Sequence, residues 1–283
     1  MGNRERTWAI LLTGGGEDPL ESKRQTLLEM TLSRARSIAP RDRIVAVIER
    51  AAKRHWNESL GELPRENVIV QPHHRGSAIE VLLAVLTMLE RDPWARIVVM
   101  PSHRHVSNEA ALAGSLLDAA IPTAQTRNNL ALIGINQVSA NAESGYIVPG
   151  RWFEDGTRSV LSIVKPSATS SARQLAARGA LLDSAIVAAR ALVLIGVLRV
   201  CVPDLVDQIE TALAQGDAGE VRQRALAKVY SRLPSVDLSQ VLAHGAASVC
   251  RVITSRSWSN LPSVRGSSPY EERRQELRPG RVS

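Results

Sequence analysis

Short apolar runs alternate with longer segments of helical periodicity over the N-terminal third of the chain. The apolar runs, each bounded by polar or turn-forming residues, are residues 8–12, 44–48, 68–70 and 97–100. In residues 27–38 and 77–89 the apolar positions instead recur at the spacing of one helix face. Strands that alternate with helices of this length indicate βαβ units and a parallel sheet.

The helix predicted over residues 77–89 has a typical start. Ser77 stands at its first position, and Glu80 follows three residues later. This spacing predicts a capping box, in which the two side chains bond free backbone N–H groups of the first turn.

The rest of the chain mixes both periodicities, and we predict one domain over residues 1–262. Further strands are predicted over residues 130–135, 144–148, 159–164, 186–189 and 247–253. Helices are predicted over residues 170–178 and from Pro203 to about Tyr230, with a break at Gly216. From residue 263 the composition turns to Arg, Glu, Ser, Pro and Gly, which predicts a disordered basic tail over residues 263–283. The expected fold class is α/β: a Rossmann-like mixed, mostly parallel sheet flanked by helices in a single domain.

Charge and composition narrow the class of ligand. The chain has 283 residues, 44% of them hydrophobic, which is enough for one large α/β domain. Its formal net charge of +7 favours phosphorylated or polyanionic ligands, although an ordinary surface on which Arg replaces Lys and Glu is an alternative. No Lys/Arg block is long enough to mark a nucleic-acid tract, so no specific nucleic-acid partner is expected.

Cysteine usage and hydropathy predict a cytoplasmic protein. Cys201 and Cys250 have no CxxC or metal-ligand spacing, which is typical of buried thiols in a reducing compartment. No stretch approaches the roughly 20 apolar residues of a membrane span. The run at residues 8–12 is too short for the core of a signal peptide.

Three polar segments follow predicted strands directly, and ligands bind at the carboxyl ends of strands in such sheets. They are residues 14–16, 71–78 and 101–106. Glycines after a first strand let backbone N–H groups approach a phosphate closely, which suits Gly14, Gly15 and Gly16. The three glycines match neither the P-loop nor the dinucleotide fingerprint, so a plain tight turn is an equal alternative.

Several short stretches, in order and at nearly the same spacing, resemble the sugar-nucleotide pyrophosphorylases, most closely the mannose-1-phosphate guanylyltransferases. The most specific are Gln71-Pro-His-His-Arg-Gly-Ser-Ala78, Arg91-Asp92-Pro93 leading to Met100-Pro101-Ser102, and Glu143-Ser-Gly-Tyr-Ile-Val-Pro-Gly150. Lys165-Pro166, residues 181–191 and Leu233-Pro-Ser-Val-Asp237 add to the resemblance, which covers about residues 8–261. It implies the nucleotide-diphospho-sugar transferase fold and a reaction of GTP or another nucleotide with mannose 1-phosphate or another sugar 1-phosphate, giving GDP-mannose and pyrophosphate in the closest case. It also implies Mg²⁺.

On the nucleotide side, the resemblance assigns Gly14, Gly15 and Gly16 to the phosphate loop. It assigns Arg75, Gly76 and Ser77 to the turn that contacts base and ribose, although a helix start alone would also explain Ser77. The family's loop is roughly a dozen or more residues longer and carries a catalytic Arg that has no counterpart here. Residues 17–24 leave only Lys23 as a remnant of the catalytic set.

Both positions that match the family's metal-binding aspartates carry other residues. His103 and Asn260 stand in those places. Imidazole is a poor Mg²⁺ ligand, and an amide carbonyl supplies no charge. A separate metal site built from the paired histidines of residues 73–74 and 103–105 is disfavoured, because adjacent side chains rarely converge on one ion.

On the sugar side, the resemblance assigns five residues to the sugar phosphate. They are Glu143, Gly145, Tyr146, Lys165 and Asp183. Lys165 could pair with a phosphate as a compact point charge, or it could be a solvated lysine at a strand end. Asp183 stands where the family has Asn.

Two functions follow from this sequence. The first is a mannose-1-phosphate guanylyltransferase-like enzyme. The second is an inactive binding or regulatory homologue that retains a sugar phosphate or nucleotide; the shortened loop and the replaced aspartates favour weak or no activity. Assembly with itself or with another chain is left open by the sequence.

Overall fold

The computed structural model describes residues 6–14, 21–51, 53–102, 109–126, 128–136, 142, 144–215, 220–245 and 247–255. The predicted tail at 263–283 therefore lies outside the described residues. None of the helices within these ranges is long and apolar enough to cross a membrane.

The described strands form one nine-stranded sheet in the order β3-β2-β1-β4-β8-β5-β9-β7-β6. Their bounds are β1 Thr7–Leu12, β2 Ile44–Glu49, β3 Val68–Gln71, β4 Arg96–Pro101, β5 Leu130–Ile135, β6 Tyr146–Trp152, β7 Arg158–Val164, β8 Leu181–Arg190 and β9 Cys250–Ser255. The four strands at the N-terminal end pair in parallel, as predicted, with β1 between β2 and β4.

The prediction of a mostly parallel sheet is wrong for the second half. Of the pairings between described strands, β1–β2, β1–β4, β2–β3 and β5–β9 are parallel, whereas β4–β8, β5–β8, β6–β7, β6–β8 and β7–β9 are antiparallel. Because β8 pairs with both β5 and β6, the strands β8, β5, β9, β7 and β6 close into a ring. Two features cause this: β8 pairs antiparallel with the distant strands β4, β5 and β6, and β6 and β7 form a hairpin in whose turn the Phe153 N–H donates to the Thr157 carbonyl.

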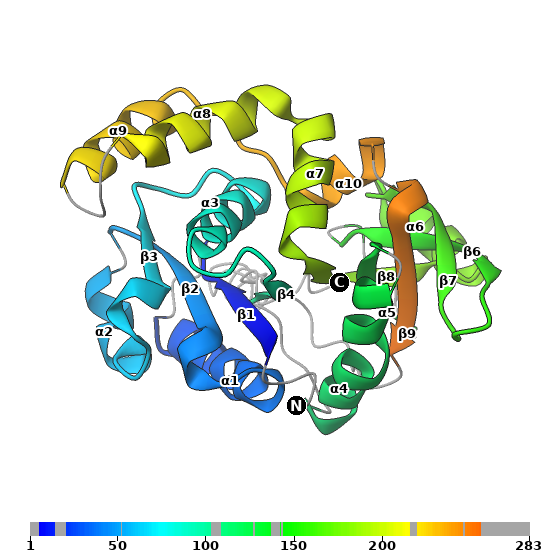
Figure 1. The fold of residues 1–283 in the computed structure, drawn as a ribbon. Coiled ribbons are helices and arrows are strands. Elements are labelled where there is room, and N and C mark those ends of the chain that lie inside the picture. Colours follow the sequence, from blue (N-terminus) through cyan, green and yellow to red (C-terminus); the bar gives the residue numbers. More distant parts are fainter. Residues whose placement is uncertain are drawn as a thin grey trace, which may run out of the picture.

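Helices cover both faces of the parallel half of the sheet (Figure 1). Their bounds are α1 Glu21–Ile38, α2 Lys53–Leu60, α3 Ser77–Leu89, α4 Glu109–Ser115, α5 Ile121–Thr126, α6 Thr169–Ala177, α7 Ala191–Cys201, α8 Pro203–Ala214, α9 Glu220–Tyr230 and α10 Leu238–Gly245. Helix α3 ends at the predicted residue, Leu89. The helix predicted from Pro203 to about Tyr230, with a break at Gly216, is formed as the two helices α8 and α9. Helix α7, which is largely apolar, was not predicted.

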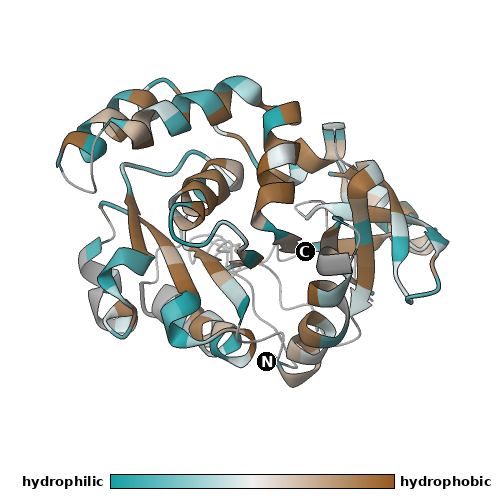
Figure 2. Cartoon of the chain, viewed as in Figure 1, coloured by the Kyte–Doolittle hydropathy of each residue, from teal (hydrophilic) through white to brown (hydrophobic). Residues whose placement is uncertain are grey.

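Alternate residues of β1 enter two different cores, as the period of a strand requires. Trp8, Ile10 and Leu12 pack with α3, α7, α8 and α10, whereas Ala9 and Leu11 pack with α1 and α2. Both faces are therefore buried, which explains why the strand is apolar throughout instead of alternating. Figure 2 shows the central strands as hydrophobic, with polar residues gathered on the outer surfaces of α8 and α9.

Candidate functional site

The three segments predicted to bind ligand begin at one edge of the sheet. Leu12 of β1 is in register with Val47 of β2 and with Pro101 of β4. Beyond these strands, the Thr13 N–H donates to the Val47 carbonyl, and the Ser102 N–H donates to the Leu12 carbonyl. The carboxyl ends of β1, β3 and β4 therefore lie at a common edge, as the sequence predicted.

Gly14 lies against the half-buried ring of His74 and the buried carboxylate of Glu80. A β-carbon at this position would clash with Oε1 of Glu80 and with Nδ1 of His74. Close packing thus explains why a glycine opens this turn, whether or not the turn binds phosphate.

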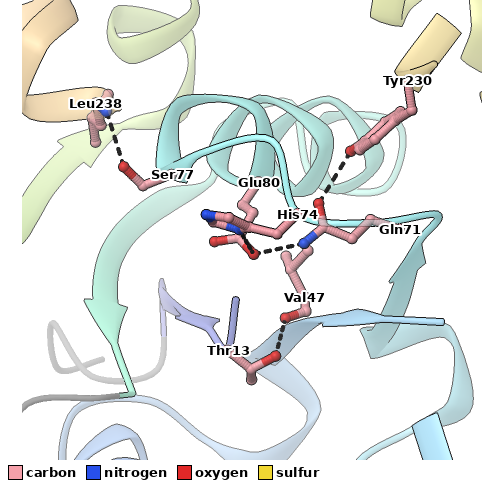
Figure 3. A network of polar contacts seen from close by, with 8 residues as sticks. All are labelled: Thr13, Val47, Gln71, His74, Ser77, Glu80, Tyr230 and Leu238. Carbon is pink, nitrogen blue, oxygen red and sulfur yellow. Dashed lines mark hydrogen bonds and ion pairs between the residues drawn. The ribbon is translucent and has the colours of Figure 1, made fainter. Parts of the chain in front are cut away.

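The carboxylate of Glu80 is the centre of a polar network between α3 and the strands β1–β3 (Figure 3). Glu80 is 1% exposed, and its Oε1 accepts a hydrogen bond of 2.6 Å from Nε2 of Gln71. The Tyr230 hydroxyl donates to Oε1 of Gln71 at 3.3 Å. Nδ1 of His74 lies 3.3 Å from Oε1 of Glu80. A buried carboxylate is costly unless it is hydrogen-bonded or paired, and this network supplies both kinds of partner.

The hydrogen bond with Glu80 raises the pKa of His74 above its ordinary value, against the opposing effect of burial. The negative charges of Glu80, Glu49 and Asp237 act in the same direction as the hydrogen bond. Burial raises the pKa of the Tyr230 hydroxyl, so Tyr230 stays a neutral donor.

The turn at Arg75, Gly76 and Ser77 is joined to the segment that leads into α10. Gly76 has a positive φ of 90°, and a β-carbon there would clash with the Val236 carbonyl. The Ala78 N–H donates to that carbonyl at 3.0 Å, and the Val236 N–H donates to the Arg75 carbonyl at 3.0 Å. Nε of Arg75 donates to the Tyr230 carbonyl at 3.1 Å.

The predicted capping box is not formed. Gly76, not Ser77, is the N-cap of α3, and the cap makes no side-chain hydrogen bond. The Ser77 hydroxyl instead accepts a bond of 2.9 Å from the Leu238 N–H, and Glu80 is bonded to Gln71. Tertiary partners have displaced the local pattern.

Three residues predicted for the sugar side form a row across neighbouring strands. Tyr146 of β6 is in register with Val164 of β7 and with Leu182 of β8. Gly145 precedes Tyr146, while Lys165 and Asp183 follow Val164 and Leu182. Because these strands are antiparallel, the three residues lie side by side, and the Asp183 N–H donates to the Gly145 carbonyl at 2.9 Å. Asp183 is also in register with Gly134 of β5. Lys165 is exposed at the end of β7.

The Asp183 carboxylate is largely buried, at 7% exposure, and both of its oxygens are bonded. Oδ1 accepts a bond of 2.8 Å from the Ala185 N–H, and Oδ2 accepts a bond of 2.8 Å from the Ser239 hydroxyl. Ala185 has a φ of 59° and lies where the β5–β8 register shifts. Asp183 therefore stabilises a bulge in β8 and bonds it to Ser239 of α10. Tyr146 is fully buried beside Ile135 and Leu182.

The segment of residues 236–239, which we call the strap, joins the two predicted half-sites. At one end it bonds to the Gly76 turn through Val236 and Leu238. At the other end Ser239 bonds to Asp183. Sequence reasoning used Leu233–Asp237 only as a sign of resemblance and gave Ser239 no role. No local pattern could have revealed this role, because the partners of the strap lie far away in the chain.

The remaining predicted site residues lie outside the described part of the chain. They are Gly15, Gly16, Glu143, His103 and Asn260. Lys23 lies in α1, but its side chain is not described. The roles assigned to all of these residues stay predictions.

The comparisons with known proteins identify the fold. No known protein-family profile matches the chain, and no curated protein matches its sequence. Solved structures do resemble it, and three of them illustrate the range. The mannose-1-phosphate geranyltransferase of Thermus thermophilus has a TM-score of 0.76 at 19% identity and covers 89% of this chain and 75% of its own. The mannose-6-phosphate isomerase of Helicobacter pylori has a TM-score of 0.70 at 19% identity, and the match covers 90% of this chain and 100% of the isomerase. The inositol-1-phosphate CTP transferase of T. maritima has a TM-score of 0.52 at 11% identity, with 96% of each chain covered.

At these identities the likeness concerns the fold. The chain is a single mixed α/β domain of the type found in sugar-phosphate nucleotidyltransferases. This is the type of fold that the resemblance to sugar-nucleotide pyrophosphorylases implied.

Replacing Gly76 with Ala should destabilise the chain, because it combines a positive φ with a clash against the strap. We expect a loss of more than about 2 kcal/mol in the free energy of unfolding, measured in urea. Gly179→Ala is the matched control, since Gly179 has a φ of 82° but no atom within 4 Å of an added β-carbon. Equal losses in the two variants would contradict a structural role of the contact with the strap.

The pairing of His74 with Glu80 should make stability depend on pH. The pKa of His74 is raised in the folded chain, so the stabilisation is complete below the unfolded value of about 6.5 and is lost as pH rises through the folded-state pKa. We expect His74→Gln to lower the unfolding free energy by about 1–3 kcal/mol at acidic pH and by less at alkaline pH. Urea unfolding across this range checks the sign, with His73→Gln as the control. A loss that grows with pH would contradict this assignment.

Proposed function

We propose that this chain binds a guanine nucleotide and a sugar 1-phosphate and is a mannose-1-phosphate guanylyltransferase-like nucleotidyltransferase with low turnover. One observation carries the proposal. The turn predicted for the nucleotide and the row predicted for the sugar phosphate come from distant parts of the sequence, and the strap connects them directly. Two substrates that must react require two half-sites at a fixed separation.

The nucleotide half is supported by the fold and by the place of its turns. The glycine turn and residues 75–77 follow β1 and β3 at the carboxyl edge, where ligands bind in open α/β sheets. Arg75 is half-buried, and its Nε bond to the Tyr230 carbonyl holds the guanidinium in one orientation.

The sugar half is supported by charge. Lys165 is exposed at the end of β7, and it forms no hydrogen bond or ion pair with the described residues. Its ammonium group suits a phosphate monoester, because a flexible lysine acts as a compact point charge. The neighbouring Gly145 carbonyl accepts one bond from the Asp183 N–H and has a second lone pair to which a sugar hydroxyl can donate.

The residues at the two metal positions do not fit Mg²⁺. A hard cation of this size needs carboxylate oxygens, and the donor set of His103 and Asn260 contains none. The carboxylates of Glu80 and Asp183, which do lie among the described residues of this edge, already accept bonds from protein groups.

The chemistry that this chain's own residues can support is positioning and charge neutralisation. In a guanylyl transfer, an oxygen of the sugar phosphate attacks the α-phosphorus of the nucleotide in line, and pyrophosphate leaves. The attacking oxygen is already anionic, so no base is needed. Lys165 would hold the sugar phosphate, and Arg75 with the glycine turn would hold the nucleotide. Without a fitted metal site, we expect the charge on the leaving pyrophosphate to be poorly neutralised.

A second candidate function is binding without turnover, as in a regulatory homologue. The specific observation in its favour is the Glu80 carboxylate directly beside Gly14. Where His74 is neutral, the negative charge of Glu80 behind a phosphate loop opposes a triphosphate, because like charges within a few Å repel by about 1 kcal/mol or more in a partly shielded site.

Pyrophosphate release from GTP, mannose 1-phosphate and Mg²⁺ tests the first function. We expect release well below about 1 s⁻¹, since each missing charge-stabilising group lowers the rate by about 10²–10³. Calorimetry with each substrate alone supplies the second measurement. Binding without release supports the regulatory homologue, ordinary enzymatic rates refute low turnover, and failure to bind either substrate refutes the proposal as a whole.

Lys165→Gln should weaken binding of mannose 1-phosphate about tenfold or more while leaving the affinity for GTP unchanged, because it removes the cation of the sugar half only. Lys53→Gln on α2 is the matched control for loss of one surface charge. Calorimetry with the two ligands measures both affinities. A similar loss for GTP would contradict the division into two half-sites.

A further inference from the structure

His74 is the one described histidine at the glycine turn whose ring pairs with a carboxylate. The ring is partly accessible, with 26% of its side chain exposed, whereas the Glu80 side chain behind it is 1% exposed.

We propose that His74, held in its cationic form by Glu80, is a phosphate-binding group of the nucleotide half-site. The inference rests on the proposed function, and it names the charge that stands in for the basic residue missing from the shortened phosphate loop. The ligand class is a nucleoside di- or triphosphate, including a nucleotide sugar.

The ring lies beside the first residue of the turn predicted to bind phosphate. Gly14 is in contact with both His74 and Glu80, so the imidazole borders the first residue of the glycine turn. Nδ1, the ring nitrogen nearest Gly14, is bonded to Glu80 at 3.3 Å, and Nε2 makes no bond to the described residues. A charged imidazole bonded in this way keeps its Nε2–H as a donor for a ligand, and charge-assisted bonds of this kind suit phosphate oxygens.

The hydrogen-bond order of the network supports a cation. Oε1 of Glu80 accepts from Gln71, and Gln71 accepts in turn from the Tyr230 hydroxyl. This order directs the Gln71 amide donor toward the buried Glu80 carboxylate, and the imidazolium of His74 supplies a second, charged donor to the same oxygen.

The charged and titratable groups around His74 act in one direction. Glu80 on α3, Glu49 at the end of β2 and Asp237 in the strap all favour the imidazolium. Tyr230, at the end of α9, stays neutral. Arg75 is bonded to a backbone carbonyl and not to His74.

The chemistry of guanylyl transfer points to a binding cation and not to a general base. The attacking phosphate oxygen carries no proton that must be removed, so an imidazole base would have no task. A positive charge beside the leaving phosphates neutralises charge that both substrates bring to the site.

Calorimetric titration of the full chain with GDP-mannose tests the inference, because its diphosphate keeps a constant charge near neutral pH. We expect the affinity of the unaltered chain to fall about tenfold or more as pH rises from about 5.5 to about 9, as the imidazolium is lost. His74→Gln should bind about tenfold more weakly at acidic pH and show no such fall. His74→Lys should keep the affinity at alkaline pH. Glu80→Gln should move the fall to lower pH.

His73→Gln is the matched control, since His73 lies in the same turn but contacts the Tyr230 carbonyl and ring. It should behave as the unaltered chain does, and thermal melting confirms that each variant is folded. Binding that is independent of pH, or equal in the unaltered chain and a folded His74→Gln variant, overturns the role of His74 and leaves the proposed function standing. If the unaltered chain binds neither GDP-mannose nor GTP at any pH, the proposed function and this inference fall together.

Discussion

The contact of the strap with the Gly76 turn is the interaction on which the rest of the site depends. The turn belongs to the parallel half of the sheet, and Asp183 belongs to the ring of strands in the other half. The strap bonds to both, through Val236 and Leu238 at one end and through Ser239 at the other. Only a glycine fits this approach, because φ is positive and the Val236 carbonyl fills the space of a β-carbon. The separation between the two predicted half-sites is therefore set by backbone bonds of Val236 at one end and by the side chains of Ser77, Ser239 and Asp183.

Charge at the carboxyl edge follows from the same packing. Glu80 projects from the first turn of α3 toward Gly14, and helix, turn and strand together bury it. A buried carboxylate must recruit donors, and Gln71 and His74 are those within reach. The helix that positions the Gly76 turn thus also determines which ionisable groups stand behind the glycine turn. Fold and electrostatics are coupled at this point, so a change in one alters the other.

The sequence predicted the parts of the structure that local patterns control. The apolar runs of β1, β2 and β4 are strands because helices cover both sides of them. The mostly parallel sheet was a wrong prediction, because the place of β8 depends on pairings with distant strands. Ser77 and Glu80 have the spacing of a capping box, yet the hydroxyl found a partner 161 residues away. The resemblance assigned Gly145, Lys165 and Asp183, which come from separate stretches, to one ligand. Their position side by side depends on strand register, which is non-local and cannot be predicted from local patterns. The pairing of His74 with Glu80 spans a turn and a helix start, so neither helical nor strand periodicity could reveal it.

A fold of this type persists at 19% identity over 89% of the chain because its core requires only apolar side chains of suitable volume. Chemistry is more demanding, since each charge at the site comes from one side chain. In this chain the described residues form the Gly76 turn, the strap and the bulge at Asp183. Beside them lie the exposed Lys165, the His74–Glu80 pair and the bonded carboxylate of Asp183. Under the proposed function, affinity for two phosphorylated ligands needs only net attraction. Turnover is harder to keep, since it requires charge stabilisation that grows in the transition state.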